Sequence, residues 1–209
     1  MSEIRTRLTF EKTGRAVYIS HLDLMRLLAR AMVRAELPFK HTEGFNPHPY
    51  ISLARPLALG FEGRAELCDF VLEQPMPNEE IVTRMNSVLP GGVAIISSCS
   101  VDAKIKDISY SEYEIHIDCN ASKVEALFNG PVIVLKRKKK GPPEPTDITP
   151  MVKRLTATDG KVVVLLKDAG DGGLNPSYVA DAMLAEGVAS GHARIVRTGF
   201  FDSSEKPVK

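Results

Sequence analysis

The segment ISHLDLMRLLARAMVRAELP, residues 19–38, carries the clearest structural signal in the chain. Ser20 and Asp23 have the spacing of a capping box in its shorter-acid form, and Ile19 and Leu24 have the spacing of a hydrophobic staple. Pro38 closes the segment. Apolar side chains recur between these limits at spacings of three and four, namely at Leu24, Leu27, Leu28, Ala31 and Ala35. The pattern predicts an amphipathic helix over residues 21–36.

Strand patterns surround this helix in a definite order. Alternating apolar and polar residues predict strands over residues 4–11, 50–54, 66–74 and 93–101, and a shorter strand is expected within 39–43. A second helix is predicted over residues 78–89, with Asn78 as its N-cap. The order β-α-β-β-α-β is that of a ferredoxin-like unit with an insertion in its central hairpin.

The second half of the chain repeats this order. Strands are predicted over residues 113–119, 131–138, 161–167 and 192–200, with helices over 121–129 and 175–187. We therefore expect an α+β protein made of tandem ferredoxin-like halves with antiparallel sheets, residues 1–104 and 105–209. The polar stretch VDAKIKDIS, residues 101–109, is the expected boundary.

Composition limits the class of protein. Hydrophobic residues make up 44% of the 209 residues and charged residues 25%, which is typical of a packed globular chain. The N-terminal segment has no apolar run of signal-peptide length, so we expect a soluble, cytoplasmic protein. Three cysteines, Cys68, Cys99 and Cys119, form no CxxC pair, and we expect reduced thiols and no bound metal or other cofactor.

Charge is distributed unevenly along the chain. The net charge is +4 over residues 1–60, −7 over residues 61–130 and +4 over residues 131–209. Two basic features are candidates for contact with phosphate groups, because guanidinium groups and runs of cations match a polyanion. They are a stripe on the first helix, Arg26, Arg30 and Arg34, and the run Lys136, Arg137, Lys138, Lys139 and Lys140. Both features also occur as ordinary solvated surfaces.

The loop around GFNPHP, residues 44–49, is expected to be an exposed, ordered platform. Pro47 and Pro49 disfavour helical backbone at the residues before them, so Asn46 and His48 are displayed on a stiff, extended segment. Four apolar residues that follow should anchor the loop to the core, namely Ile51, Leu53, Leu57 and Leu59. We include Lys40, Asn46 and His48 among the candidate RNA-binding residues; a capping or turn-stabilising role is the alternative for His48.

No complete catalytic constellation is present in the sequence. GxSxG, HExxH and phosphate-binding loop patterns are all absent. His21, directly after the expected cap, and His48 are the only support for a metal-independent ribonuclease that uses them as acid and base. His21 has the alternative interpretation of a solvent-facing residue in a capping turn.

Three segments together resemble the radical-SAM-linked protein family, a domain found beside or fused to radical SAM enzymes. They are SHLDLMR (20–26), EGFNPHPYISLARPLALG (43–60) and ELCDF (66–70), and the resemblance extends to DITP (147–150) and RIVRT (194–198). In that family a basic residue often follows the second proline of NPHP, where this chain has Tyr50. The resemblance implies a radical SAM enzyme as partner and no reaction of the chain's own, since CxxxCxxC is absent.

The expected function is that of a non-catalytic accessory module of a radical SAM system that binds structured RNA. The tandem arrangement is also similar to that of RNA-binding proteins of the CRISPR repeat-processing group, a likeness of fold alone. Two alternatives remain open at this point: the ribonuclease that uses His21 and His48, and a scaffold that docks the radical SAM enzyme without touching RNA.

Overall fold

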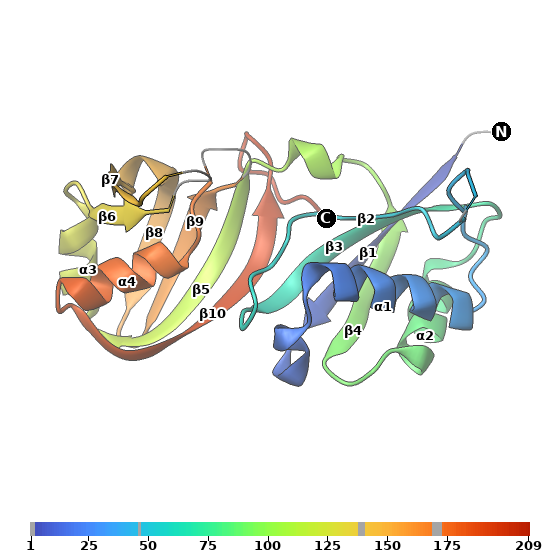
Figure 1. The fold of residues 1–209 in the computed structure, drawn as a ribbon, viewed down its shortest axis with the longest axis horizontal. Coiled ribbons are helices and arrows are strands. Elements are labelled where there is room, and N and C mark those ends of the chain that lie inside the picture. Colours follow the sequence, from blue (N-terminus) through green and yellow to red (C-terminus); the bar gives the residue numbers. More distant parts are fainter. Residues whose placement is uncertain (1–2, 46, 138–140, 169–172) are drawn as a thin grey trace. The chain divides into compact units, whose positions relative to one another are not determined.

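A computed structural model describes residues 3–45, 47–137, 141–168 and 173–209 of the chain (Figure 1). The chain divides into two compact units. The first comprises Met1–Asp107 together with Val208–Lys209, and the second comprises Ile108–Pro207. None of the helices in the described part of the chain combines the length and the apolar character needed to cross a bilayer.

The first unit is an antiparallel sheet with two helices. Strand β1 pairs with β3 on one side and with β4 on the other, and β2 adds to the free side of β3. The strand order is therefore β4-β1-β3-β2. The elements, in chain order, are β1 (Ile4–Lys12), η1 (Gly14–Tyr18), α1 (His21–Arg34), β2 (Ile51–Leu53), β3 (Glu62–Leu72), α2 (Asn78–Val88), β4 (Val93–Ser100) and η2 (Ile105–Asp107).

One apolar core holds α1 and α2 against the same face of this sheet (Figure 1). Alternate residues of β1, among them Leu8 and Phe10, meet Leu28 of α1 and Met85 of α2 in this core. Helix α1 begins as expected, because the Ser20 hydroxyl accepts a hydrogen bond from the Asp23 N–H at 3.2 Å. The amphipathic pattern of residues 21–36 thus fixes which side of the sheet is covered by helices.

Local predictions in this unit needed three corrections. Asn78 does not cap α2; its side-chain oxygen instead accepts a hydrogen bond from the Ser98 hydroxyl. Residues 39–43 form only isolated bridges, Phe39 with Leu72 and His41 with Pro49, because the chain turns back too soon for a continuous ladder. Leu59 is 61% exposed and anchors nothing, whereas Leu57 is buried.

The second unit is also an antiparallel sheet with two helices. Strand β5 lies between β10 and β9, and β8 adds to the far side of β9, which gives the order β10-β5-β9-β8. The elements are β5 (Tyr110–Cys119), α3 (Ala121–Phe128), β6 (Ile133–Lys136), β7 (Glu144–Asp147), η3 (Thr149–Met151), β8 (Val152–Thr158), β9 (Lys161–Lys167), α4 (Ser177–Ala185) and β10 (Ala189–Phe201).

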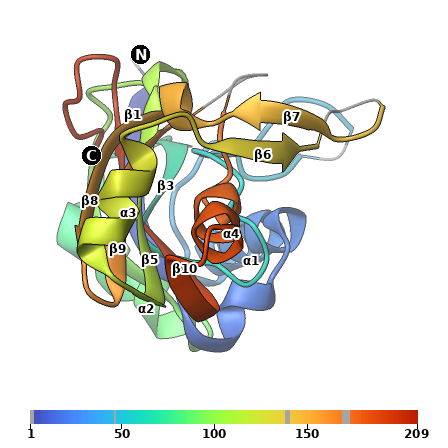
Figure 2. The ribbon, with the colours of Figure 1, turned by 90° about the vertical axis from the view of Figure 1, so that its left-hand side faces the viewer.

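The basic strand expected over residues 131–138 is not part of this main sheet. Its central part, β6, pairs with β7 in a separate two-stranded sheet, and β8 takes the place beside β9 (Figure 2). The reason is visible in the sequence, since Val152 to Thr158 lead through a two-residue turn into β9. The α+β class with antiparallel sheets is confirmed, and the β6–β7 hairpin is an addition to it.

Candidate nucleic-acid interface

A small pocket lies on the face of the first unit's sheet that the helices leave free. Period-two alternation places Arg5 of β1, Ser52 of β2 and Asp69 of β3 on this face, since Leu8, Phe10, Cys68 and Phe70 point to the core. These residues line a pocket of about 200 Å³ with Tyr50 and with a wall formed by Val101 and residues 104–106. The pocket is thus built from all three neighbouring strands.

Arg7, which is fully buried, joins the floor of this face to the segment that follows β4. Its Nε and Nη2 atoms donate to the two carboxylate oxygens of Asp69 at 2.6 and 2.8 Å. Nη2 also donates to the Ala103 carbonyl at 2.7 Å, and Nη1 donates to the main-chain oxygen of Lys209 at 2.8 Å. One guanidinium therefore fixes the strand, the pocket wall and the last two residues together, and it neutralises Asp69.

The rim of the pocket is cationic. Arg5 pairs with Glu3 at 3.2 Å, and Lys40 pairs with the same carboxylate at 3.1 Å. The hydrogen bond from Lys40, and after it the one from Arg5, lowers the pKa of Glu3 below its usual value. Lys104 and Lys106 are exposed and form no ion pair within the described residues. The pocket lining therefore contains more cationic than anionic side chains.

Tyr50 supplies an aromatic ring beside these cations and is 57% exposed. It is held there by the chain around it, because its N–H donates to the Lys40 carbonyl at 3.0 Å. Two further bonds close the loop: Thr42 N–H donates to the His48 carbonyl at 2.8 Å, and His48 N–H donates to the Thr42 hydroxyl at 3.2 Å. The proline-rich loop thus places Tyr50 at the pocket, and its own tip carries the exposed Phe45.

His48 itself is exposed, and its ring Nδ1 lies 3.2 Å from the Pro49 carbonyl oxygen. That contact is a hydrogen bond when Nδ1 carries the proton and donates it. No hydrogen bond joins His48 to His21 within the described residues, and His21 is the half-buried first residue of α1. Asn46 lies outside the described residues. Because no described contact joins His21 and His48, their role as the acid–base pair of a ribonuclease stays a prediction.

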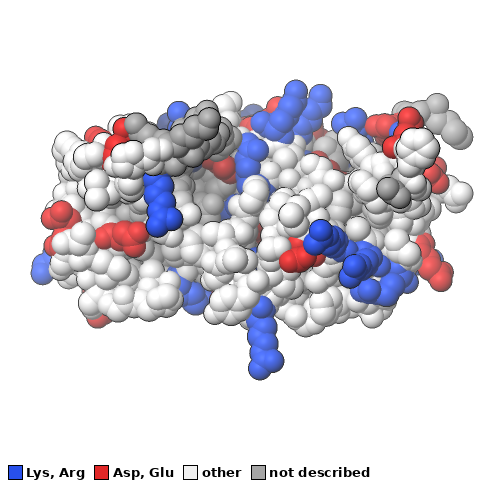
Figure 3. Space-filling view, in the orientation of Figure 1, with Lys and Arg blue, Asp and Glu red and all other residues white. Residues whose placement is uncertain are grey.

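The arginine stripe of α1 is partly used inside the unit. Arg26 pairs with Asp23 at 3.0 Å, and Arg34 donates to the Val88 carbonyl at the C-terminal end of α2 at 3.0 Å. Arg30 is exposed and contributes only a longer-range attraction to Asp23, whose pKa is lowered chiefly by the Ser20 hydrogen bond. Figure 3 shows basic side chains following the line of α1 beside an acidic group. The stripe is less available to phosphate than its spacing predicts.

The basic run that begins at Lys136 is also engaged in part. The Lys136 ammonium donates to the Gly173 carbonyl at 3.0 Å and contacts the Met151 sulfur. The Arg137 N–H donates to the Tyr178 hydroxyl at 2.9 Å, while its side chain is exposed. Lys138, Lys139 and Lys140 lie outside the described residues, so their role in RNA binding stays a prediction.

The cysteines and potential metal ligands offer no second site in the described part of the chain. Cys68, Cys99 and Cys119 are free thiols, and burial raises the pKa of Cys68 to about 12. A thiol with such a pKa stays protonated and unreactive at neutral pH. No group of three or more His, Cys, Asp and Glu side chains among the described residues is suited to hold a metal ion.

The sequence analysis did not identify four residues of the pocket: Arg5, Tyr50, Lys104 and Lys106. Lys104 and Lys106 lie in the stretch interpreted as a boundary, within the most acidic third of the chain, so the segment charge concealed them. Tyr50 stands where the family that the sequence resembles often has a basic residue, so the family pattern does not point to an aromatic ring there. The signal that could have found Arg5 is the strand alternation itself, which puts Arg5 and Arg7 together on the face away from Leu8 and Phe10.

Comparisons with known proteins are informative at the level of the family. Among solved structures, a chain of the crystal structure of a Cbf5–Nop10–Gar1 complex is similar over 93% of this chain, with a TM-score of 0.47 and 11% identity. The similar region covers 48% of that chain, so this protein spans about half its length. No curated protein matches the sequence. The family model described as "Uncharacterized protein conserved in bacteria (DUF2344)" matches residues 5–176, and the chain belongs to this family.

Proposed function

We propose that the protein is a non-catalytic RNA-binding module, and that the free sheet face of the first unit receives an unpaired nucleotide of a structured RNA. One observation carries the proposal. An exposed aromatic ring, Tyr50, stands at a small pocket whose rim also carries three cations, Arg5, Lys104 and Lys106. Bases stack on aromatic side chains whatever their sequence, and cations neutralise the adjoining phosphates.

The size and charge of the pocket support a single flat group as the ligand. Its volume of about 200 Å³ is below the range of about 300–1,000 Å³ that is typical of sites for drug-sized molecules. The one carboxylate in the lining, Asp69, is already bonded to Arg7 and so does not repel a phosphate as a free acid would. Bases in loops and bulges are the RNA groups that are free to enter such a pocket.

The arrangement of strands supports the same proposal. When the main-sheet strands of each unit are numbered one to four in chain order, both sheets have the spatial order 4-1-3-2. Every neighbouring pair of strands in them is antiparallel. We infer a ferredoxin-like arrangement in both units, with the β6–β7 hairpin inserted in the second. Sheets of this kind are used by RNA-recognition modules, which stack bases on aromatic residues of the free face.

The wider setting belongs to the proposal as well. The motifs SHLDLMR and GFNPHP, which resemble those of the radical-SAM-linked family, support a radical SAM enzyme as the partner to which this module presents RNA. The cytoplasmic location expected from the sequence stays a prediction. Binding of the RNA and docking of the enzyme are separable, because each can be measured with the other component left out.

RNA binding is tested by fluorescence anisotropy with a labelled hairpin that has an unpaired loop. We expect Tyr50→Ala to weaken binding by about tenfold, since stacking contributes about 1–3 kcal/mol per base, and Tyr50→Phe to restore it. Tyr18→Ala is the matched control, because Tyr18 is an exposed tyrosine of the same unit that does not line the pocket. Unchanged binding by Tyr50→Ala would exclude this pocket as the RNA site.

The dependence of binding on salt gives a second readout. Each phosphate contact on single-stranded RNA contributes about −0.7 to the slope of log K against log salt. Replacing both Lys104 and Lys106 with alanine should therefore reduce the slope by about 1.4. Lys123→Ala, on the exposed surface of α3, should leave the slope as it is. Absence of any salt-dependent RNA binding would favour the scaffold, and RNA cleavage lost in His48→Ala would favour the ribonuclease.

A further inference from the structure

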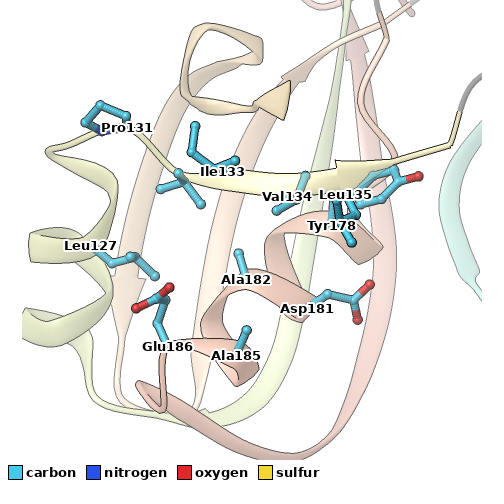
Figure 4. A pocket seen from close by; sticks show the side chains of 11 residues that line it. Leu127, Pro131, Ile133, Val134, Leu135, Tyr178, Asp181, Ala182, Ala185 and Glu186 are labelled. Carbon is cyan, nitrogen blue, oxygen red and sulfur yellow. The ribbon is translucent and has the colours of Figure 1, made fainter. Parts of the chain in front are cut away.

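A groove in the second unit lies between the inserted hairpin and helix α4. It has a volume of about 460 Å³ and is lined by Leu127 of α3, Val134 and Leu135 of β6, and Ala182 and Ala185 of α4. Figures 1 and 2 both show β6 running beside α4, and Figure 4 shows these side chains around the groove. Small alanines on the helix leave the groove open, so an occupant can lie along the strand.

Apolar side chains are exposed where the groove opens. Ile133 is 60% exposed and Leu135 is 67% exposed, both on a strand only four residues long. Neither is covered by another element of the second unit's described residues. Neighbouring exposed apolar residues beside a groove are typical of a surface that another chain covers.

The edge of β6 that faces the groove carries main-chain groups that pair with no strand in the described part of the chain. Main-chain groups of a strand point alternately to its two sides, and the Val132 carbonyl is bonded on the β7 side, to the Ile148 N–H at 2.9 Å. The Arg137 N–H is bonded on the opposite side, to the Tyr178 hydroxyl of α4. Ile133, Leu135 and Arg137 are alternate residues along the strand, so the N–H and C=O groups of Ile133 and Leu135 point to the same side as the Arg137 N–H, toward the groove. The described residues provide no strand partner on that side.

The helix side of the groove is acidic. Asp181 and Glu186 are exposed residues of the lining, and neither forms an ion pair with the described residues. Figure 4 shows one carboxylate on each side of Ala182 and Ala185. Two carboxylates that form no ion pair within the described ranges favour a cationic occupant and repel phosphates, so this groove differs in charge from the pocket that we propose for RNA.

From these observations we infer that the groove binds an extended peptide segment of a partner protein, which adds as a strand to the free edge of β6. Alternate apolar side chains of the peptide cover Leu127 and Ala182, and its Lys or Arg side chains pair with Asp181 and Glu186. This is strand addition between a sheet edge and a helix, in which main-chain bonds give affinity and the side chains give specificity. The inference is independent of RNA binding by the first unit.

A second copy of this chain fits the groove less well than a separate peptide. In each copy the same edge of β6 is backed by its own α4, because both elements line the one groove. Two such recessed edges obstruct one another before their main-chain groups come within hydrogen-bonding distance. A single extended strand has no such obstruction, since it brings only its own side chains.

The test is a selection from random peptides of about seven residues displayed on phage, carried out against the full chain. Ala185→Arg fills the groove from an exposed helix position and is the blocked variant. Ala126→Arg, an exposed alanine of α3 outside the lining, is the matched control. We expect enriched peptides with alternating apolar residues and at least one Lys or Arg. Their synthetic versions should bind Ala185→Arg about tenfold more weakly or worse, and Ala126→Arg normally.

Two further measurements distinguish the occupants. N-methylation at the centre of a selected peptide should abolish binding, and Asp181→Asn with Glu186→Gln should weaken it by about fivefold or more. The inference is overturned if no peptide is enriched more strongly on the unchanged protein than on Ala185→Arg. It is also overturned if acidic peptides are selected, or if N-methylation of the peptide does not weaken binding. A dimer in light scattering that Ala185→Arg dissociates would instead make a second copy the occupant.

Discussion

Arg7 is a buried cation with three partners from distant parts of the chain: the carboxylate of Asp69 and the main-chain oxygens of Ala103 and Lys209. A buried charge of this type contributes little net stability while it is paired, because its desolvation offsets the attraction. Removing one partner of the pair, in contrast, strongly destabilises the fold, because the remaining charge is buried where neither water nor a counter-ion solvates it. Asp69, with 20% of its side chain exposed, is that partner.

We expect Asp69→Ala to lower the free energy of unfolding by about 3 kcal/mol, the lower end of the range for breaking a buried pair. Changing Arg7 to Met as well should recover part of this loss, because no unpaired charge then remains. Urea denaturation followed by circular dichroism measures both. Arg26→Ala, which breaks the exposed pair with Asp23, is the control and should change little. A loss below about 1 kcal/mol for Asp69→Ala would show that water reaches the guanidinium.

At the same scale, the sequence could predict some site residues and not others. The exposure predicted for the proline-rich loop is found at Gly44, Phe45, Pro47 and His48, whereas Pro49 is buried. The sequence points to His48 as the side chain that this loop presents, whereas the hydrogen bonds of the loop place Tyr50 at the pocket. Lys104 and Lys106 become visible only when the wall that Arg7 holds has been located. The hydrogen bond from Arg7 to Ala103 that holds this wall joins residues 96 positions apart, and a contact of that kind has no local sequence signature.

Among the elements, α1 is the one whose sequence pattern and packing agree most closely. Leu24, Leu28 and Ala31 are buried as their spacing predicts, and Ser20 caps the helix. The second unit's β6 is the opposite case, since an apolar run followed by cations predicts a strand but not its neighbour. β8 and β6 are alternative neighbours for β9. The short turn between β8 and β9 has a lower entropic cost of closure than the longer connection from β6, so β8 pairs with β9.

Leu28→Ala tests the packing of α1. Leu28 is fully buried in the core, so the variant should lose about 2–5 kcal/mol of unfolding free energy, the usual cost of a large-to-small core change. Leu22→Ala is the matched control in the same helix, where Leu22 is 62% exposed and should change the stability by less than about 0.5 kcal/mol. Equal effects of the two substitutions in thermal or urea denaturation would contradict the assigned face of the helix.

On the scale of the whole molecule, the chain crosses from one unit to the other and returns. Residues 108–207 form the second unit, and Val208 and Lys209 belong again to the first. Val208 is buried, and the main-chain oxygen of Lys209 accepts a hydrogen bond from Arg7. The strand patterns of residues 1–104 could not predict this, because they account for a complete βαββαβ order without any residue from the end of the chain.

Truncation after Pro207 should therefore destabilise the first unit, although the residues removed are more than a hundred positions away from it in sequence. Burial of a valine side chain contributes about 1.5 kcal/mol or more, and a hydrogen bond to a charged group contributes about 1.5–3 kcal/mol. Hydrogen exchange measured by mass spectrometry should show faster exchange in β1 and β3 and unchanged exchange in β5 and β9. Lys209→Ala is the control, because it keeps both Val208 and the main-chain oxygen that Arg7 binds. Exchange in β1 that is unaffected by the truncation would mean that Asp69 and Ala103 alone satisfy the buried guanidinium, and that the return of the chain adds nothing to the first unit.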